Sequence, residues 1–243
     1  MEIVHKHFKT IESTNTWGKL NCHLFDQNKM TLITSETQTK GRGRFKREWV
    51  SPPHENIYAT FCFAIDKKRV DIGNIPQILS ISAAKTLKNL HFLPALKWPN
   101  DLLLSQKKVA GILCETVSFD THFMVILGIG LNINMPLQSL KTINRPATSL
   151  FNETGKHYVV KDVLHLLELQ FLTDFEVFLK NGFSPFLEEY KKLISTSSNQ
   201  ILRFHDNLNI VEGTFSGVND DGTLNLLIKS GIIKKFISGE FLP

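Results

Sequence analysis

Residues 40–47 concentrate positive charge around two glycines, Gly41 and Gly43, and five of these eight residues are cationic. Glycine lets the backbone come close to a ligand, and guanidinium groups match the geometry of phosphate oxygens. The stretch therefore indicates a site for a phosphate-bearing anion. The same composition also fits a solvated basic loop or a nucleic-acid patch, and the spacing is neither a Walker A loop nor G-x-G-x-x-G.

A second candidate site combines a carboxylate with a lysine. The segment 97–101 (Lys-Trp-Pro-Asn-Asp) leads into an apolar strand, and Lys108 stands at the start of the next strand. We expect a hairpin that presents Asp101 and Lys108 together. Taken singly, Asp101 also fits a turn or cap residue, and Lys108 fits an ordinary surface charge.

Two further polar segments interrupt apolar ones. Residues 12–16 carry short polar side chains between a strand and a helix, a pattern that also fits a helix N-cap. Residues 128–134 space glycines and amides along a strand. An amide in such a strand would either read a base edge or satisfy a bulge.

Hydrophobic periodicity supplies the elements that must position these segments. It predicts strands at 3–8, 30–35, 56–65, 101–104, 109–116 and 123–134, and helices at 75–90, 159–179 and 185–193. From residue 198 the pattern changes to short strands at 201–204, 208–215, 224–228 and 232–237, separated by turn signals. The sequence therefore predicts an α+β body, a boundary near 194–199 and a small C-terminal β-barrel.

Composition excludes several classes of protein. The chain has 243 residues, 42% of them hydrophobic and 21% charged, with a net charge of +5. This balance is that of a globular protein and permits an anionic ligand. No apolar run approaches the roughly 20 residues of a membrane span, and no signal-peptide core follows the N-terminus. The three scattered cysteines, Cys22, Cys62 and Cys114, favour reduced thiols, so we expect a cytoplasmic protein without disulfides or zinc.

In their order along the chain, these segments resemble the catalytic module of biotin protein ligase, also called biotin–[acetyl-CoA-carboxylase] ligase. Residues 12–15 match E-S-T-N, and Gln38 with 41–44 matches Q-x-x-G-R-G-R. Residues 97–101, 108–113 and 128–132 match K-W-P-N-D, K-[LV]-x-G-I-L and G-[IA]-G-[IL]-N, and 238–240 fits the closing G-E strand. The resemblance implies a mixed-sheet catalytic domain of the biotin/lipoate ligase type at 1–197 and an SH3-like β domain at 198–243.

The resemblance also implies a two-step reaction. Biotin and ATP give biotinyl-5′-adenylate and pyrophosphate, and a lysine amine of a biotin carboxyl carrier protein then attacks. The implied catalytic residues are Lys108, Arg44 and Asp101. Lys108 would offset the repulsion between the two anions, Mg²⁺ would neutralise the departing pyrophosphate, and Asp101 would orient or deprotonate the amine.

The implied binding residues form two sets. Biotin would contact Ser13, Thr14, Asn15, Gln38, Arg42, Gly43, Arg44, Lys108 and Gly111. ATP and the adenylate would contact Arg42, Arg44, Trp49, Asn100, Lys108 and Asn132. Closure of residues 40–47, here called the arginine-glycine loop, would keep water from the mixed anhydride. The metal ligands and the formation of a homodimer stay open.

Two departures from the family pattern matter. Lys46 stands where the loop usually has a glycine, so a positive φ at this position would strain the backbone. The closing strand is also not followed by the basic residue that is often found there, so any adenylate contact from that residue is missing or supplied elsewhere.

Two rival functions remain. A lipoate ligase or octanoyltransferase shares the fold but lacks the 97–101 segment and the arginine-glycine loop. A nucleic-acid-binding protein would explain the basic loop. Bifunctional relatives carry a helix-turn-helix domain before the E-S-T-N motif, whereas only twelve residues precede Ser13. We therefore expect a monofunctional ligase that binds no nucleic acid.

Overall fold

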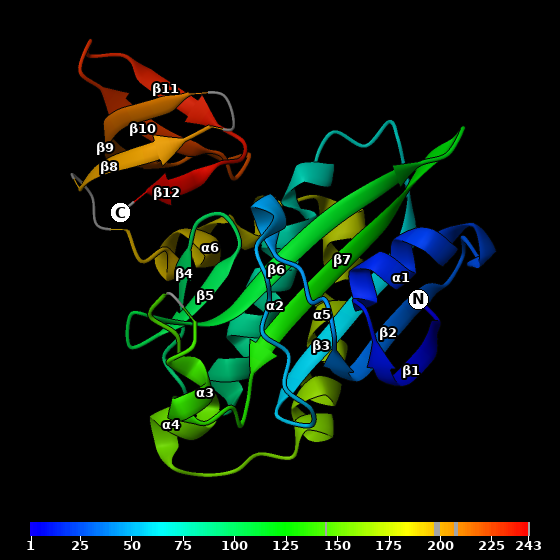
Figure 1. The fold of residues 1–243 in the computed structure, drawn as a ribbon. Helices are drawn as coiled ribbons and strands as arrows, with labels where there is room; N and C mark the ends of the chain where they lie inside the picture. The colour runs from blue at the N-terminus through cyan, green and yellow to red at the C-terminus, as the bar shows by residue number, and fades with distance from the viewer. Residues whose placement is uncertain (144, 197–199, 207–208, 243) are drawn as a thin grey trace.

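The computed structural model describes residues 1–143, 145–196, 200–206 and 209–242, with the backbone alone for Lys46. Two sheets divide the chain into a body and a smaller C-terminal part, the β domain (Figure 1). The predicted boundary between residues 197 and 198 lies outside the described residues. In the ranges given above, none of the helices is long and apolar enough to cross a membrane.

A seven-stranded mixed sheet forms the body, in the order β1-β2-β3-β7-β6-β5-β4. β1 and β2 are parallel, and all other neighbours are antiparallel. The strands are β1 (Ile3–Ile11), β2 (Met30–Gln38), β3 (Asn56–Asp66), β4 (Ala95–Lys97), β5 (Asp101–Leu104), β6 (Lys107–Ser118) and β7 (His122–Asn132). All were predicted from the sequence except β4, which is too short to show a period.

Helices cover both faces of this sheet. They are α1 (Thr14–Asn21), α2 (Ile75–Asn89), α3 (Leu137–Leu140), α4 (Leu150–Thr154), α5 (Val160–Asn181) and α6 (Leu187–Leu193). Short 3₁₀ turns are η1 (Cys22–Leu24), η2 (Arg44–Lys46), η3 (Ile72–Asn74) and η4 (Ser184–Phe186). The long helices α2 and α5 agree with the predicted ranges, whereas α3 and α4 span about one turn each and were not predicted.

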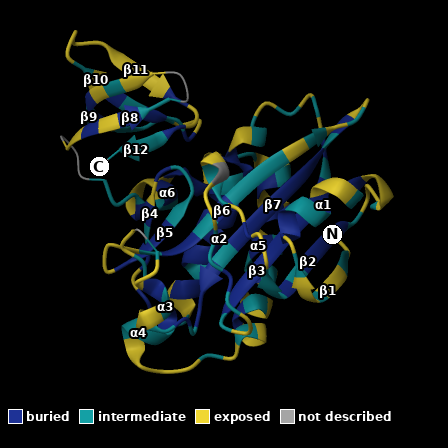
Figure 2. Ribbon diagram, in the orientation of Figure 1, coloured by how far each residue is buried: buried dark blue, intermediate teal, exposed yellow. Residues whose placement is uncertain are grey.

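The sheet is buried on both faces because its central strands carry apolar residues at successive positions. On β3, Phe61 and Phe63 pack against Phe171 and Phe175 of α5, with ring centroids 4.6 and 4.5 Å apart. Cys62, which lies between them, belongs to a smaller cluster on the α1 side. Side chains alternate along a strand, so one apolar run contributes to two layers. Figure 2 shows the resulting buried centre of the sheet.

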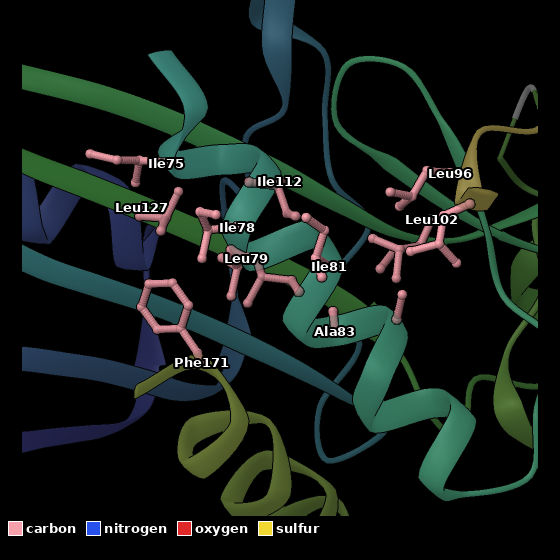
Figure 3. Packing of buried hydrophobic residues seen from close by; sticks show 14 of the residues in the cluster. Ile75, Ile78, Leu79, Ile81, Ala83, Leu96, Leu102, Ile112, Leu127 and Phe171 are labelled. Atoms are coloured by element: carbon pink, nitrogen blue, oxygen red, sulfur yellow. The ribbon is translucent and has the colours of Figure 1, made fainter. Parts of the chain in front are cut away.

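Helix α2 completes the larger hydrophobic layer. It begins with Pro76 in its first turn, the position where proline costs no hydrogen bond. Ile78 and Leu79, both fully buried, lie beside Leu127 of β7 (Figure 3). This layer packs α2 and α5 against one face of the seven-stranded sheet. Helix α1 and the candidate site lie on the other face of the sheet.

The β domain is a five-stranded antiparallel sheet in the order β11-β10-β9-β8-β12. Its strands are β8 (Ile201–His205), β9 (Ile210–Val218), β10 (Leu224–Ile228), β11 (Ile233–Phe236) and β12 (Glu240–Leu242). The four strands predicted by periodicity are confirmed, although the predicted start at residue 208 lies outside the described residues. β12 pairs with β8 and brings the end of the chain back to the body.

The cysteines behave as the sequence predicts. Cys22, Cys62 and Cys114 are all free thiols, and the first two are buried. Burial raises the pKa of the Cys62 thiol well above its ordinary value. These thiols are therefore protonated packing groups at neutral pH.

Candidate functional site

A cavity of about 480 Å³ is lined by both the body and the β domain. Every residue that the sequence assigns to catalysis or binding lines it, and the β domain adds Gly239, Glu240 and Phe241. The structure therefore brings the separate motifs together in one place. The individual roles of these residues stay predictions.

One end of the cavity is built on the start of α1. Ser13 is the N-cap, and its Oγ accepts from the backbone N–H of Thr16. The backbone N–H of Thr14 donates to Gln38 Oε1 over 2.8 Å, and Gln38 Nε2 donates to Ser51 Oγ over 3.1 Å. The N-cap interpretation is thus correct, and Ser13 also lines the cavity. The arrangement offers neutral, pre-oriented polar groups to a ligand.

Asn15, the next residue of α1, is also held by hydrogen bonds. Its Nδ2 donates to the carbonyl of Leu113 over 3.1 Å, and its Oδ1 lies 2.7 Å from Thr60 Oγ1. A Cβ at Gly128 would lie only 1.9 Å from Asn15 Oδ1, so only glycine leaves room for this amide. Thr60 was not among the predicted site residues, although a hydroxyl inside the apolar run of β3 is itself a signal.

Arg42 is directed toward the same end. Its Nε donates to Thr16 Oγ1 over 3.0 Å, and its Nη2 donates to Glu115 Oε2 over 2.7 Å. Lys19 is also paired with Glu115. Burial opposes the charge on Glu115, but the bond from Lys19 and the charge of Arg42 hold its pKa below the ordinary value.

Two other loop arginines reach the β domain. Arg44 Nη1 donates to Asn100 Oδ1 over 3.2 Å and to the Gly239 carbonyl over 3.0 Å. Arg47 forms a bidentate pair with Glu240. Burial opposes the charge on Glu240, but the bonds from Arg47 hold its pKa below the ordinary value. The β domain thus fastens the arginine-glycine loop directly.

The strained residue in this loop is Phe45. It has φ 56° and ψ 36°, and it is the non-helical residue of η2. The arginine side chains of Arg44 and Arg47 lie 5.0 and 5.5 Å from the centre of its ring. The positive φ expected at Lys46 is therefore found one residue earlier, at Phe45.

The part of the cavity wall formed by β5 and β6 holds an ion pair. Lys108 Nζ lies 2.6 Å from Asp101 Oδ1 across the hairpin of β5 and β6. Ser105 and Gln106, at φ 48° and 62°, form its turn, which matches the two positive φ angles of a type I′ hairpin. The predicted hairpin forms and brings the carboxylate and the lysine together.

Trp49 lies over the glycines of the neighbouring strands. A Cβ at Gly130 would lie 2.3 Å from its indole, and one at Gly111 would lie 3.1 Å from it. Lys108 Nζ is 5.3 Å from the ring centroid. The buried Trp49 Nε1 has no hydrogen-bond partner among the described residues. It is therefore a donor that a ligand could use.

Asn132 closes the wall formed by β7. It is 3% exposed, and its Nδ2 donates to the Thr148 carbonyl over 3.0 Å. The bulge considered for this strand is absent, because β7 keeps an unbroken register with β3 and with β6. Over the described part of the chain, no group of three or more His, Cys, Asp or Glu side chains could hold a metal ion.

Comparisons with known proteins agree with this geometry. The model of the Biotin/lipoate A/B protein ligase family matches residues 7–132, more than half of the chain. The Escherichia coli bifunctional ligase/repressor BirA is 28% identical over 208 residues, which are 85% of this chain and 64% of that protein. The Paracoccus denitrificans biotin–[acetyl-CoA-carboxylase] ligase is 27% identical, covering 80% of this chain and 82% of that one.

Solved structures extend the match to the whole described fold. The biotin protein ligase from Aquifex aeolicus in complex with biotin and ATP has a TM-score of 0.80 and 28% identity, covering 99% of this chain and 97% of that chain. By contrast, the chain spans 64 to 65% of the length of the bifunctional ligase/repressors from E. coli and two Bacillus strains.

Proposed function

We propose that this chain, which belongs to the biotin/lipoate A/B protein ligase family, is an ATP-dependent biotin protein ligase. It would form biotinyl-5′-adenylate and transfer the biotinyl group to a lysine of a biotin carboxyl carrier protein. The observation that carries this proposal is one cavity whose lining combines short neutral polar groups (Ser13, Thr14, Asn15 and Gln38) with the cations Arg42, Arg44 and Lys108. The complex of the Aquifex relative with biotin and ATP supports the same assignment.

The neutral polar groups suit the ureido ring of biotin, which has two N–H donors and one carbonyl acceptor. Ser13, Thr14 and Gln38 present matching short polar groups, ordered by α1 and by Ser51. The dithiolane ring of lipoate has no such donors or acceptors. It would cover these groups without bonding them and so would forgo the hydrogen bonds that the ureido ring adds, each worth about 0.5–1.5 kcal/mol net. This argument favours biotin over lipoate or octanoate.

The cations Lys108 and Arg44 suit the first chemical step. The biotin carboxylate must approach the α-phosphate of ATP, and the two anions repel. Lys108 supplies a cation at the mouth of β6, and its bond to Asp101 holds it in place. Arg44, fixed by Asn100 and Gly239, supplies a second cation toward the phosphates. Such preorganised charges stabilise the developing charge of the transition state.

Magnesium would enter with ATP. Mg²⁺ usually keeps water and phosphate ligands and takes only one or two carboxylates from the protein. The carboxylates in the described lining of the cavity are Glu48, Asp101 and Glu240, so a protein ligand to the ion would come from these. Asp101 and Glu240 would then be shared between the ion and their partners Lys108 and Arg47. The ion would supply charge neutralisation for the pyrophosphate leaving group.

In the second step the carrier lysine must be a neutral amine. Its nitrogen attacks the carbonyl carbon of the mixed anhydride, the bond to the phosphate oxygen breaks, and AMP leaves. Asp101 is the carboxylate beside Lys108, so it is the group that we propose orients the amine and accepts its proton. The expectation that the chain binds no nucleic acid stays a prediction.

A competition assay tests this proposal. The protein is incubated with ATP, magnesium and equal concentrations of biotin and lipoate, and the acyl-adenylates are separated by mass. We expect biotinyl-5′-adenylate as the main product. Lipoyl-adenylate as the main product would favour the rival ligase, and the absence of any adenylate would reject both.

A further inference from the structure

The β domain is fastened to the body at a second place, away from Gly239 and Glu240. The turn between β9 and β10 presents two backbone carbonyls, those of Asp221 and Gly222. Asn74 Nδ2 donates to the Asp221 carbonyl over 2.9 Å, and Gln77 Nε2 donates to the Gly222 carbonyl over 2.8 Å. Both amides are 6% exposed. Because a buried amide is costly to leave unpaired, these bonds hold the turn firmly.

The fit around Gly222 is close. Gly222 has φ 75°, and a Cβ there would lie 2.3 Å from Gln77 Oε1. Asn74 Nδ2 also donates to that Oε1 over 2.6 Å. The carbonyl end of the Gln77 amide is therefore occupied, which directs its Nε2 to the turn.

Trp98 connects this contact to the candidate site. Its Nε1 donates to the same Gly222 carbonyl over 3.2 Å. Its ring packs on Phe204 of β8 and Phe241 of β12, with centroids 5.7 and 6.4 Å away. Trp98 belongs to the 97–101 segment, which also carries Asn100. The two fastenings of the β domain therefore meet at one segment of the site wall.

We propose that Gln77 is a positioning residue for the ATP end of the cavity. By holding Gly222 it sets the place of the β domain, and hence of the Gly239 carbonyl that orients Arg44. Gln77 does not itself line the cavity. Other buried polar groups of α2 differ from it: Ser80 donates within its own helix, to the Pro76 carbonyl.

The inference rests on the proposed function, and steady-state adenylate synthesis tests it. Gln77→Met keeps the side-chain length and removes both the donor to the Gly222 carbonyl and the acceptor for Asn74 Nδ2, and Ser80→Ala is the matched control on α2. We expect Gln77→Met to raise the KM for ATP by about fivefold or more, because one net hydrogen bond is worth about that factor, and to change the KM for biotin less than about twofold. Ser80→Ala should change neither KM.

The decisive arm is the double variant with Arg44→Ala. If Gln77 acts through Arg44, adding Gln77→Met to Arg44→Ala changes the KM for ATP by less than about twofold. The inference would be overturned if Gln77→Met raised the KM for ATP by the same factor in the parent and in Arg44→Ala. An unchanged KM for ATP in folded Gln77→Met would also overturn it. If Gln77→Met does not fold, Gly222→Ala disturbs the same contact, because its Cβ would lie 2.3 Å from Gln77 Oε1, and it should change the two KM values in the same way. A parent protein that forms no adenylate would instead reject the proposed function.

Discussion

Arg42 Nη2 lies 2.7 Å from Glu115 Oε2, so this loop arginine is tied to β6 at the α1 end of the cavity. Arg44 is tied to the β domain instead, through the Gly239 carbonyl. The two arginines are separated by a single residue, yet they anchor the loop in opposite directions. The loop therefore links the α1 end of the cavity to the β domain.

The first prediction concerns the Arg42–Glu115 pair. Arg42→Ala and Glu115→Gln should each weaken biotin binding, by about tenfold for a lost charge-assisted hydrogen bond. The double variant should lose less than the sum of the two single losses, because the Arg42–Glu115 contact is lost in all three, while each single change also alters a contact of its own, with Thr16 or with Lys19. Calorimetric titration with biotin measures this. Lys40→Ala, which removes an exposed pair with Glu12, is the control. Additive losses would show that the two residues act separately.

The second prediction concerns pH. The pKa of Glu115 in the folded protein lies below its ordinary value of 4.5. Its charge therefore stabilises the fold above pH 4.5, and this contribution is lost as the pH falls through the folded pKa. Glu115→Gln should lower the free energy of unfolding at neutral pH, and the gap to the parent should close in acid. Urea unfolding over a pH series measures it. A gap that stays constant with pH would contradict the assignment.

The third prediction concerns Lys108. Lys108→Ala should abolish adenylate formation and leave the fold intact, because a lysine at the mouth of a strand contributes little to the core. Its exposed neighbour gives the control: Lys107→Ala should keep activity close to that of the parent. Adenylate synthesis and thermal unfolding are measured on both. Near-normal synthesis by folded Lys108→Ala would remove Lys108 from the mechanism.

The fourth prediction concerns retention of the intermediate. Arg44→Ala and Gly41→Val should release adenylate into solution faster than the parent, with a smaller effect on biotin binding. Arg44 holds the loop to the β domain, and a Cβ at Gly41 would lie 2.4 Å from the Trp49 carbonyl. Lys40→Val places the same side chain at an exposed neighbouring position and serves as the control. The protein is separated rapidly from the solution, and the adenylate in each fraction is measured. Retention equal to that of the parent in either variant would refute a covering role for the loop.

Much of the fold could be predicted because the central elements are long. The apolar run of β3 and the face formed by Phe171, Phe175 and Phe178 on α5 carry clear periods. β4 and β12 have three residues each, and α3 has four. A period cannot appear over so few positions. These elements form because neighbouring strands and loops hold them, which is tertiary information.

The candidate site also combines contacts that local sequence predicts with contacts that it does not. Asp101 and Lys108 share one hairpin, so their proximity follows from local sequence. Glu115 was missed, although it lies on the same face of β6 as Gly111 and Leu113 and could have been found by alternation. The contact of Arg44 with Gly239 joins residues 195 positions apart, and no local pattern predicts it.

Biotin transfer to a carrier lysine tests the central claim most directly. The protein is incubated with biotin, ATP, magnesium and a purified biotin carboxyl carrier domain, and the intact mass of that domain is measured. We predict a gain of one biotinyl group at one lysine, dependent on ATP and lost in Lys108→Ala. A carrier domain that stays unmodified, while the parent protein is folded and ATP is present, would contradict the account.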